Sequence, residues 1–254
     1  MSWIRRFAVK QYIRIKQKEW KEHGKKIKYI FDKEENSEYL IVSFSGFGTK
    51  AGYNYMRTLK GVKANKLYIL DDLGRKDYPG TYYLGENGDY QYKEYVMNLI
   101  RQILKESDAN RIITVGSSKG GWAALYFGFR LDAYAVVAGA PQYYLGNYLD
   151  CEFHQKTFEI MVGKDVFQNK EILNDFLPEM VHNAQSGNVY LHFSDKEHTY
   201  VNHIKYLDKD LKQNTNIKYF WNVEHYEDHP EVGKFFPKYL LATVNSLVEK
   251  GAQV

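Results

Sequence analysis

Short apolar runs alternate with longer amphipathic stretches along most of the chain, and this alternation predicts strands followed by helices. The runs are rich in β-branched and aromatic residues, which favour strands, whereas the amphipathic stretches repeat their apolar positions at helical spacing. Strands are predicted at KIKYIFDK, EYLIVSFSG, NKLYILDDLG, NRIITVG, AYAVVAGAP, NVYLHFS and IKYFWN, and helices at 53–59, 91–105, 120–130, 201–211 and 229–250. This order predicts an α/β fold with a mostly parallel, doubly wound sheet and helices on both of its faces.

Two segments depart from the simple alternation. The first two strands flank the turn-forming sequence EENS, so they are expected to pair as a hairpin. Segment 141–187 interrupts the alternation of strands and helices later in the chain, with predicted helices around Phe158 and over 170–184. We expect it to form a small lid insertion over the carboxyl edge of the sheet, where open α/β sheets bind ligands.

The first 24 residues predict a basic amphipathic leader helix ending near Gly24, ahead of a single domain over 25–254. The apolar members of this pattern are Ile4, Phe7, Val9, Tyr12, Ile13 and Trp20. Residues 1–30 hold ten Lys or Arg against two Glu, so the basic character belongs to the leader and not to the rest of the chain. Two roles stay open for this helix: docking on its own domain, or contact with an anionic surface such as a membrane.

The stretch TVGSSKGGWAALYFG, residues 114–128, places a serine in a glycine-rich corner between a buried strand and a helix. Its residues 116–120 fit the G-x-S-x-G pattern, in which a sharp strand-to-helix turn exposes a nucleophile, here Ser118. Two alternatives are a phosphate-binding loop and a packing turn without chemistry. A Walker loop needs Gly-Lys-Ser/Thr after four spacer residues, whereas here Lys119 precedes the glycines, so the nucleophile interpretation is favoured.

A serine hydroxyl needs a histidine base and an acid that orients it, both later in the chain for this fold. His229 stands after the last predicted strand and directly before the last helix, and His225 is the alternative base. The acid is expected in the turn after NVYLHFS. Glu197 fits that register best, and Asp195 is the alternate acid.

Other residues are expected to contact the substrate or its developing charge. The backbone N–H groups of Lys119 and Phe47 are the predicted oxyanion donors. Gly46, in the same loop as Phe47, is a further candidate for substrate contact. Tyr143, Tyr144 and Tyr148 of the insertion would stack on sugar rings or line an acyl pocket, unless they are ordinary lid packing. Asp71 and Asp72 follow a strand and either contact substrate or cap the next turn.

Together these features resemble the α/β-hydrolase superfamily over nearly the whole chain after the leader. The GSSKGG sequence at 116–121, with a Ser-Glu-His set, resembles the branch of accessory secretory system and capsular-polysaccharide biosynthesis proteins of Gram-positive bacteria. The resemblance implies acyl-ester chemistry on glycans or glycoproteins in the cytoplasm, sometimes near the membrane. The predicted function is that of a serine esterase or acyltransferase. The alternative is a non-catalytic partner in a polysaccharide or glycoprotein export or biosynthesis complex.

Composition and the lengths of the apolar stretches limit the kinds of site and the cellular locations to be expected. Cys151 is the only cysteine, so an intramolecular disulfide and a cysteine metal cluster are excluded. No apolar stretch reaches the length of a signal peptide or a membrane span, so a cytoplasmic location is expected, with membrane association only through the leader. We expect no metal, no cofactor and no nucleic-acid partner. The expected partner is an acyl-ester substrate, and the family resemblance implies that the ester is on a glycan.

Overall fold

The computed structural model describes residues 3–48 and 50–251, which are built around one eight-stranded sheet. The strand order is β1-β2-β4-β3-β5-β6-β7-β8. Strand β2 pairs antiparallel with β1 and β4, and the strands from β4 through to β8 pair in parallel. The bounds are β1 (Lys18–Glu22), β2 (Lys25–Asp32), β3 (Tyr39–Phe44), β4 (Asn65–Ile69), β5 (Arg111–Ser117), β6 (Ala135–Gly139), β7 (Gly187–Ser194) and β8 (Ile217–Glu224).

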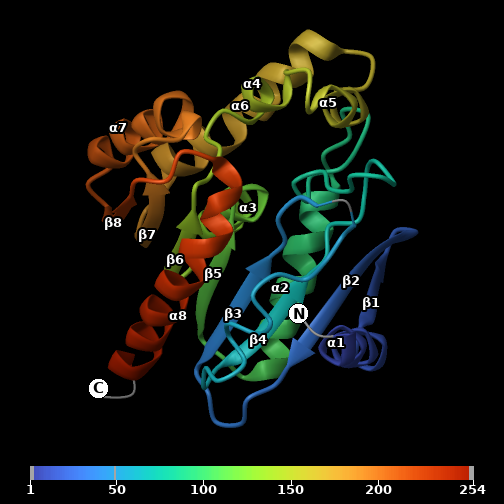
Figure 1. Cartoon of the computed structure of the whole chain (residues 1–254), viewed down its shortest axis with the longest axis vertical. Helices are drawn as coiled ribbons and strands as arrows, with labels where there is room; N and C mark the ends of the chain where they lie inside the picture. Colours follow the sequence, from blue (N-terminus) through green and yellow to red (C-terminus); the bar gives the residue numbers. More distant parts are fainter. Residues whose placement is uncertain (1–2, 49, 252–254) are drawn as a thin grey trace.

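Helices cover both faces of this sheet (Figure 1). Val96, Phe127 and Leu177 belong to the core under α2, α3 and α6, and Phe236 and Leu240 belong to the core under α8. The helices are α1 (Trp3–Lys16), α2 (Tyr92–Ser107), α3 (Lys119–Arg130), α4 (Leu145–Leu149), α5 (Gln155–Val162), α6 (Val166–Asn183), α7 (Lys205–Gln213) and α8 (Val232–Gly251), with a π-helical turn η1 (Tyr200–Ile204) and a 3₁₀ turn η2 (His229–Glu231). The predicted mostly parallel, doubly wound α/β fold is confirmed.

The expected hairpin between the first two predicted strands is wrong. Strand β2 pairs with β4, and β3 lies between β4 and β5. All six residues of β3 are buried, as a central strand covered on both faces requires, whereas β2 is partly exposed. The hairpin joins β1 to β2 instead, through a turn at His23 and Gly24 whose φ angles are 44° and 75°. Residues 53–59 form irregular backbone and turns where a helix was expected.

The leader helix is shorter than predicted, because α1 ends at Lys16 and residues 18–22 form the edge strand β1. In that strand the sequence KEWKE sends Trp20 toward the core while its charged neighbours face solvent, which is the alternation of an edge strand. The described part of α1 docks on its own domain: Tyr12 packs against the core and its hydroxyl donates to Asp32 over 2.6 Å. Met1, Ser2 and the side chains of Ile4 and Phe7 lie outside the described residues.

The segment between β6 and β7 contains α4, α5 and α6, which lie beyond one end of the sheet (Figure 1). Tyr144 and Tyr148 of this segment line the same cavity as Ser118, which follows the carboxyl end of β5. The insertion therefore contributes to the wall of the candidate site. Within residues 3–48 and 50–251, no helix combines the length and the apolar character that crossing a bilayer requires.

Candidate active site

Ser118 occupies a sharp turn between the end of β5 and the start of α3. Its φ of 53° and ψ of −124° lie outside the regions that a side-chain-bearing residue ordinarily adopts. Its backbone N–H donates to the Gly139 carbonyl over 2.8 Å. A Cβ atom on Gly116 would overlap the backbone of Gly120, and one on Gly120 would lie 2.6 Å from the Phe44 carbonyl oxygen. The glycines around Ser118 are therefore required for this turn to close.

Three residues that are far apart in sequence meet at this turn. The Ser118 hydroxyl donates to Nε2 of His229 over 2.8 Å, and Nδ1 of His229 donates to Oε2 of Glu197 over 3.0 Å. His229 begins the 3₁₀ turn before α8, and Glu197 follows β7. This relay of a hydroxyl, an imidazole and a carboxylate is the arrangement that activates a serine for nucleophilic attack.

Glu197 is 1% exposed, and its second oxygen accepts a hydrogen bond from the Thr199 hydroxyl. The two alternates from the sequence, Asp195 and His225, pair with each other over 2.8 Å at the protein surface. The structure therefore brings Glu197 and His229 to Ser118, and it places Asp195 and His225 elsewhere. A carboxylate held on both oxygens in a buried position keeps one orientation, which is what a group that positions an imidazole needs.

Of the two residues predicted to stabilise an oxyanion, Lys119 directly follows Ser118 and Phe47 lines the same cavity. Phe47 belongs to the loop after β3, and both Phe47 and Gly46 line the cavity that contains Ser118. Lys119 is the first residue of α3, so its backbone N–H lies at a helix N-terminus, where negative charge is favoured. Its side chain does not line the cavity: it is fully buried, with Nζ 2.7 Å from Asp71. Asp71 therefore forms a buried ion pair and makes no contact with the cavity.

The cavity around Ser118 has a volume of about 1010 Å³. Tyr144 and Tyr148 line it, as expected. Tyr143 does not, because its ring is fully buried and its hydroxyl donates to Asp210 over 2.6 Å. The other lining residues are mainly aromatic, amide and imidazole side chains: Asn54, Tyr78, Asn147, Phe153, His154, His198, Asn202, His203 and Tyr206. Among the described residues, the cavity wall contains no Lys, Arg, Asp or Glu.

Two of the lining histidines are held neutral. Burial, with smaller contributions from His229 and Arg75, lowers the pKa of His154 to about 4. Burial also lowers the pKa of His203 to about 4, with smaller contributions from His198 and His229. Neutral imidazoles and amides offer both donors and acceptors to a ligand without adding charge. In the described part of the chain, no group of three or more His, Cys, Asp or Glu is placed to bind a metal ion.

Gln142 is a residue of the site that the sequence analysis missed. Its amide nitrogen lies 3.4 Å from the Ser118 hydroxyl, and its carbonyl oxygen accepts from the Tyr82 hydroxyl over 3.2 Å. The side chain is fully buried. Gln142 follows the buried strand β6 by three residues, so a polar side chain just past the carboxyl end of a central strand was the available signal.

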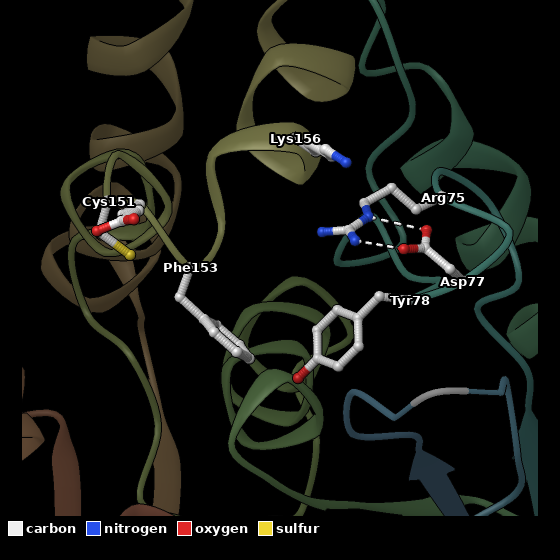
Figure 2. Close-up of a pocket in the computed structure, with 7 residues that line it drawn as sticks. Arg75, Asp77, Tyr78, Cys151, Phe153 and Lys156 are labelled. Atoms are coloured by element: carbon white, nitrogen blue, oxygen red, sulfur yellow. Dashed lines mark hydrogen bonds and ion pairs between the residues drawn. The ribbon is translucent and has the colours of Figure 1, made fainter.

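A second pocket of about 800 Å³ adjoins the first, and Tyr78, Cys151 and Phe153 line both. Figure 2 shows the Tyr78 and Phe153 rings approaching each other from opposite walls. The second pocket also carries charged groups, among them Arg75, which donates two hydrogen bonds to Asp77. The remaining wall residues are Glu152 and Lys156. A ligand that occupied both pockets would have one part against the uncharged wall beside Ser118 and another part near charged side chains.

The sheet, the serine turn and the late histidine define an α/β-hydrolase-fold protein. A family model described as "Accessory Sec system GspB-transporter" matches residues 5–216, and the chain belongs to this family. A curated accessory Sec system protein of Staphylococcus aureus (strain NCTC 8325 / PS 47) is 28% identical over 121 residues. That alignment covers 47% of this chain and 22% of the relative, so the match spans about a fifth of the relative's length.

Two solved structures share the fold. A mutant of the capsule O-acetyltransferase of Neisseria meningitidis serogroup A, in complex with CoA, superposes with a TM-score of 0.73 and 21% identity, covering 90% of this chain and 94% of that one. A chain of the Glycosylation Associate Protein (Gap123) complex from Streptococcus agalactiae superposes with a TM-score of 0.69 and 20% identity, covering 88% of this chain and 45% of that one. At these identities the similarity demonstrates the fold.

Proposed function

We propose that this chain is a serine-dependent enzyme that hydrolyses or transfers acyl esters. The observation that carries the proposal is the 2.8 Å hydrogen bond from the Ser118 hydroxyl to His229, with the buried Glu197 behind the imidazole. In this assignment Ser118 is the nucleophile, His229 the general base and then the general acid, and Glu197 the group that orients the imidazole and stabilises its charged form.

The reaction runs in two halves. His229 removes the Ser118 proton as Oγ attacks the acyl carbonyl, and the backbone N–H groups of Lys119 and Phe47 stabilise the oxyanion that forms. The tetrahedral intermediate collapses to an acyl-serine, and His229 gives its proton to the departing alcohol or thiol. An incoming hydroxyl then attacks the acyl group while His229 takes its proton, and collapse of the second intermediate returns that proton to Ser118.

The second hydroxyl decides between the two activities, since water gives an esterase and a sugar hydroxyl gives an acyltransferase. The similarity to a capsule O-acetyltransferase supports transfer to a glycan hydroxyl, with a CoA thioester as the acyl donor to test first. The wall of aromatic, amide and neutral imidazole side chains supports the same choice, because aromatic faces and uncharged hydrogen-bonding groups suit a sugar ring.

The alternative proposal is a non-catalytic role as a partner in a glycosylation or export complex. It is favoured by membership of the accessory Sec system family and by the similarity to a chain of the Gap123 complex. In that case the site around Ser118 would be a remnant of the fold, and the partner would bind whether or not Ser118 is present.

Replacement of the proposed nucleophile separates these proposals. We expect Ser118→Ala to lower kcat/KM for p-nitrophenyl acetate by a factor on the order of 10⁴ or more, since a missing nucleophile disables the whole set of catalytic groups. The matched control is Ser107→Ala, at the end of α2, which should keep wild-type activity. Equal activity in wild type and Ser118→Ala would contradict the enzymatic proposal. The alternative would be favoured if the wild type turned over neither esters nor thioesters and Ser118→Ala bound the partner as the wild type does.

A further inference from the structure

The side chain of Lys119, the residue that follows the candidate nucleophile Ser118, forms an ion pair in the protein interior. Its Nζ lies 2.7 Å from Oδ2 of Asp71, and neither side chain is exposed to solvent. Burial lowers the pKa of Lys119, and the nearby Asp71 carboxylate acts in the opposite direction. Two charges removed from water are costly unless each satisfies the other, so the two groups are forced to remain together.

Asp71 is itself fixed by the loop that follows β4. Its Oδ2 atom accepts hydrogen bonds from the backbone N–H of Thr81 over 2.9 Å and from that of Tyr83 over 3.2 Å. Charge-assisted hydrogen bonds of this kind are stronger than neutral ones. Asp71 therefore provides a rigid anchor for Lys119.

The ammonium group of Lys119 also contacts the loop after β3. It lies 3.4 Å from the Ser45 hydroxyl and above the rings of Tyr83 and Phe47, at 4.6 and 5.5 Å from their centres. The Tyr83 hydroxyl accepts the Ser45 N–H over 2.6 Å and donates to the Ile69 carbonyl over 3.0 Å. One cation thus connects the start of α3 with the loop that leads to Phe47.

Gly80 keeps the space that this arrangement needs. A Cβ atom at Gly80 would lie 3.0 Å from Cε of Lys119 and 2.9 Å from the Phe47 ring, and its φ of 134° is a conformation that favours glycine. The loop that carries Asp71's backbone partners is therefore shaped around the Lys119 stem and the Phe47 ring.

From these contacts we propose that the Lys119–Asp71 ion pair is a positioning device for the oxyanion site. This inference rests on the proposed function, in which the backbone N–H groups of Lys119 and Phe47 stabilise the oxyanion. The two donors come from different elements, one from the start of α3 and one from the loop after β3. The ion pair holds both at once, because Nζ of Lys119 is anchored on Asp71 and contacts Ser45 and the Phe47 ring.

The test compares Lys119→Met and Asp71→Asn with the matched control Asp72→Asn, whose carboxylate lines neither pocket and pairs with the partly exposed Lys28 over 2.7 Å. Each full-length variant is first checked for a cooperative thermal transition. The readouts are the rate constant for inactivation by a fluorophosphonate, and kcat and KM for p-nitrophenyl acetate. Misplaced oxyanion donors should lower the inactivation rate and kcat about 10- to 100-fold, while KM stays within about threefold. Asp72→Asn should match the wild type.

A purely structural ion pair would lower the melting temperature and leave the rates of the folded variants unchanged, and that result would overturn the inference. If Lys119→Met and Asp71→Asn fail to fold, Ser45→Ala carries the test, since it removes the hydroxyl through which the Lys119 ammonium contacts the loop that leads to Phe47. A wild-type rate in folded Ser45→Ala would then overturn it. An unreactive wild-type chain would instead contradict the proposed function, and the inference with it.

Discussion

At the scale of single residues, burial distinguishes the acid that meets the histidine from its neighbour in sequence. Glu197 is 1% exposed and contacts His229, whereas Asp195 pairs at the surface with His225. Both carboxylates follow β7 within three residues. Only the buried one lies where its field on an imidazole is not weakened by solvent, so the structure favours Glu197 for the role of orienting group.

This difference predicts unequal effects of two similar substitutions. Glu197→Gln should lower kcat/KM for p-nitrophenyl acetate by about 10³- to 10⁴-fold, because the amide no longer holds the imidazole in the tautomer that accepts the Ser118 proton. Asp195→Asn should leave kcat/KM within about twofold of wild type. Steady-state kinetics of the two variants checks this, and equal losses, or a loss confined to Asp195→Asn, would contradict the assignment.

Much of this residue set could be predicted from the sequence, because it depends on local rules. The glycines mark the Ser118 turn, and the positions of Glu197 and His229 follow from the strand and helix that each adjoins. The contacts of Gln142 and the Lys119–Asp71 pair could not be predicted in the same way. Lys119 and Asp71 are 48 residues apart, and nothing near either one shows that its partner is a charge and not water.

At the scale of elements, the serine turn depends on how closely α3 approaches the sheet. A Cβ atom on Gly121 would lie 2.7 Å from the Gly139 carbonyl oxygen of β6, and one on Gly120 would lie 2.6 Å from the Phe44 carbonyl oxygen of β3. The helix start is thus packed against β3 and β6, the two strands on either side of β5. This close packing supplies the surrounding structure that a residue needs to persist at a positive φ, as Ser118 does.

The types of the central elements were predictable, but the pairing at one edge of the sheet was not. Continuous apolar runs such as that of β5 indicate a strand covered on both faces, wherever the chain takes it. The partner of β2 is set by the topology of the whole sheet, and local turn residues pointed to the wrong one. The predicted extent of the leader helix was wrong for a related reason. The five residues of β1 are too few to show the alternation of a strand next to the helical pattern of α1.

At the scale of the whole molecule, the candidate site and the leader occupy different regions. The insertion with α4, α5 and α6 lies beyond one end of the sheet, whereas α1 packs beside β2 at the edge that β1 and β2 form (Figure 1). The cavity formed with the insertion includes the buried neutral histidines His154 and His203. Proton uptake by these histidines therefore makes the stability of the folded chain depend on pH.

This linkage predicts that stability falls as the pH is lowered from 6.5 toward 4. Burial lowers the pKa of His203 to about 4, below the ordinary value of about 6.5 in an unfolded chain. Between these pH values the unfolded state therefore binds a proton that the folded state does not bind. Going from pH 7 to pH 5, this one histidine should remove about 1–2 kcal/mol from the free energy of unfolding. Urea unfolding at both pH values should show a smaller decline for His203→Asn than for wild type.

The matched control for this measurement is His23→Asn, in the exposed turn between β1 and β2, which should follow the wild-type pH dependence. His203→Asn keeps an acceptor near the position of Nδ1, which receives the Tyr144 N–H over 3.4 Å, so the loss of a contact is minimised. The same decline in His203→Asn as in wild type would contradict the linkage.

The central claim is that Ser118 is an activated nucleophile. The most direct measurement treats the intact protein with a fluorophosphonate and locates the added mass by peptide mass spectrometry. We expect one adduct, on Ser118, that is absent from Ser118→Ala and forms at least about 100-fold more slowly in His229→Ala, where no base accepts the proton. An unlabelled wild-type chain, or an adduct that forms equally fast without His229, would contradict it.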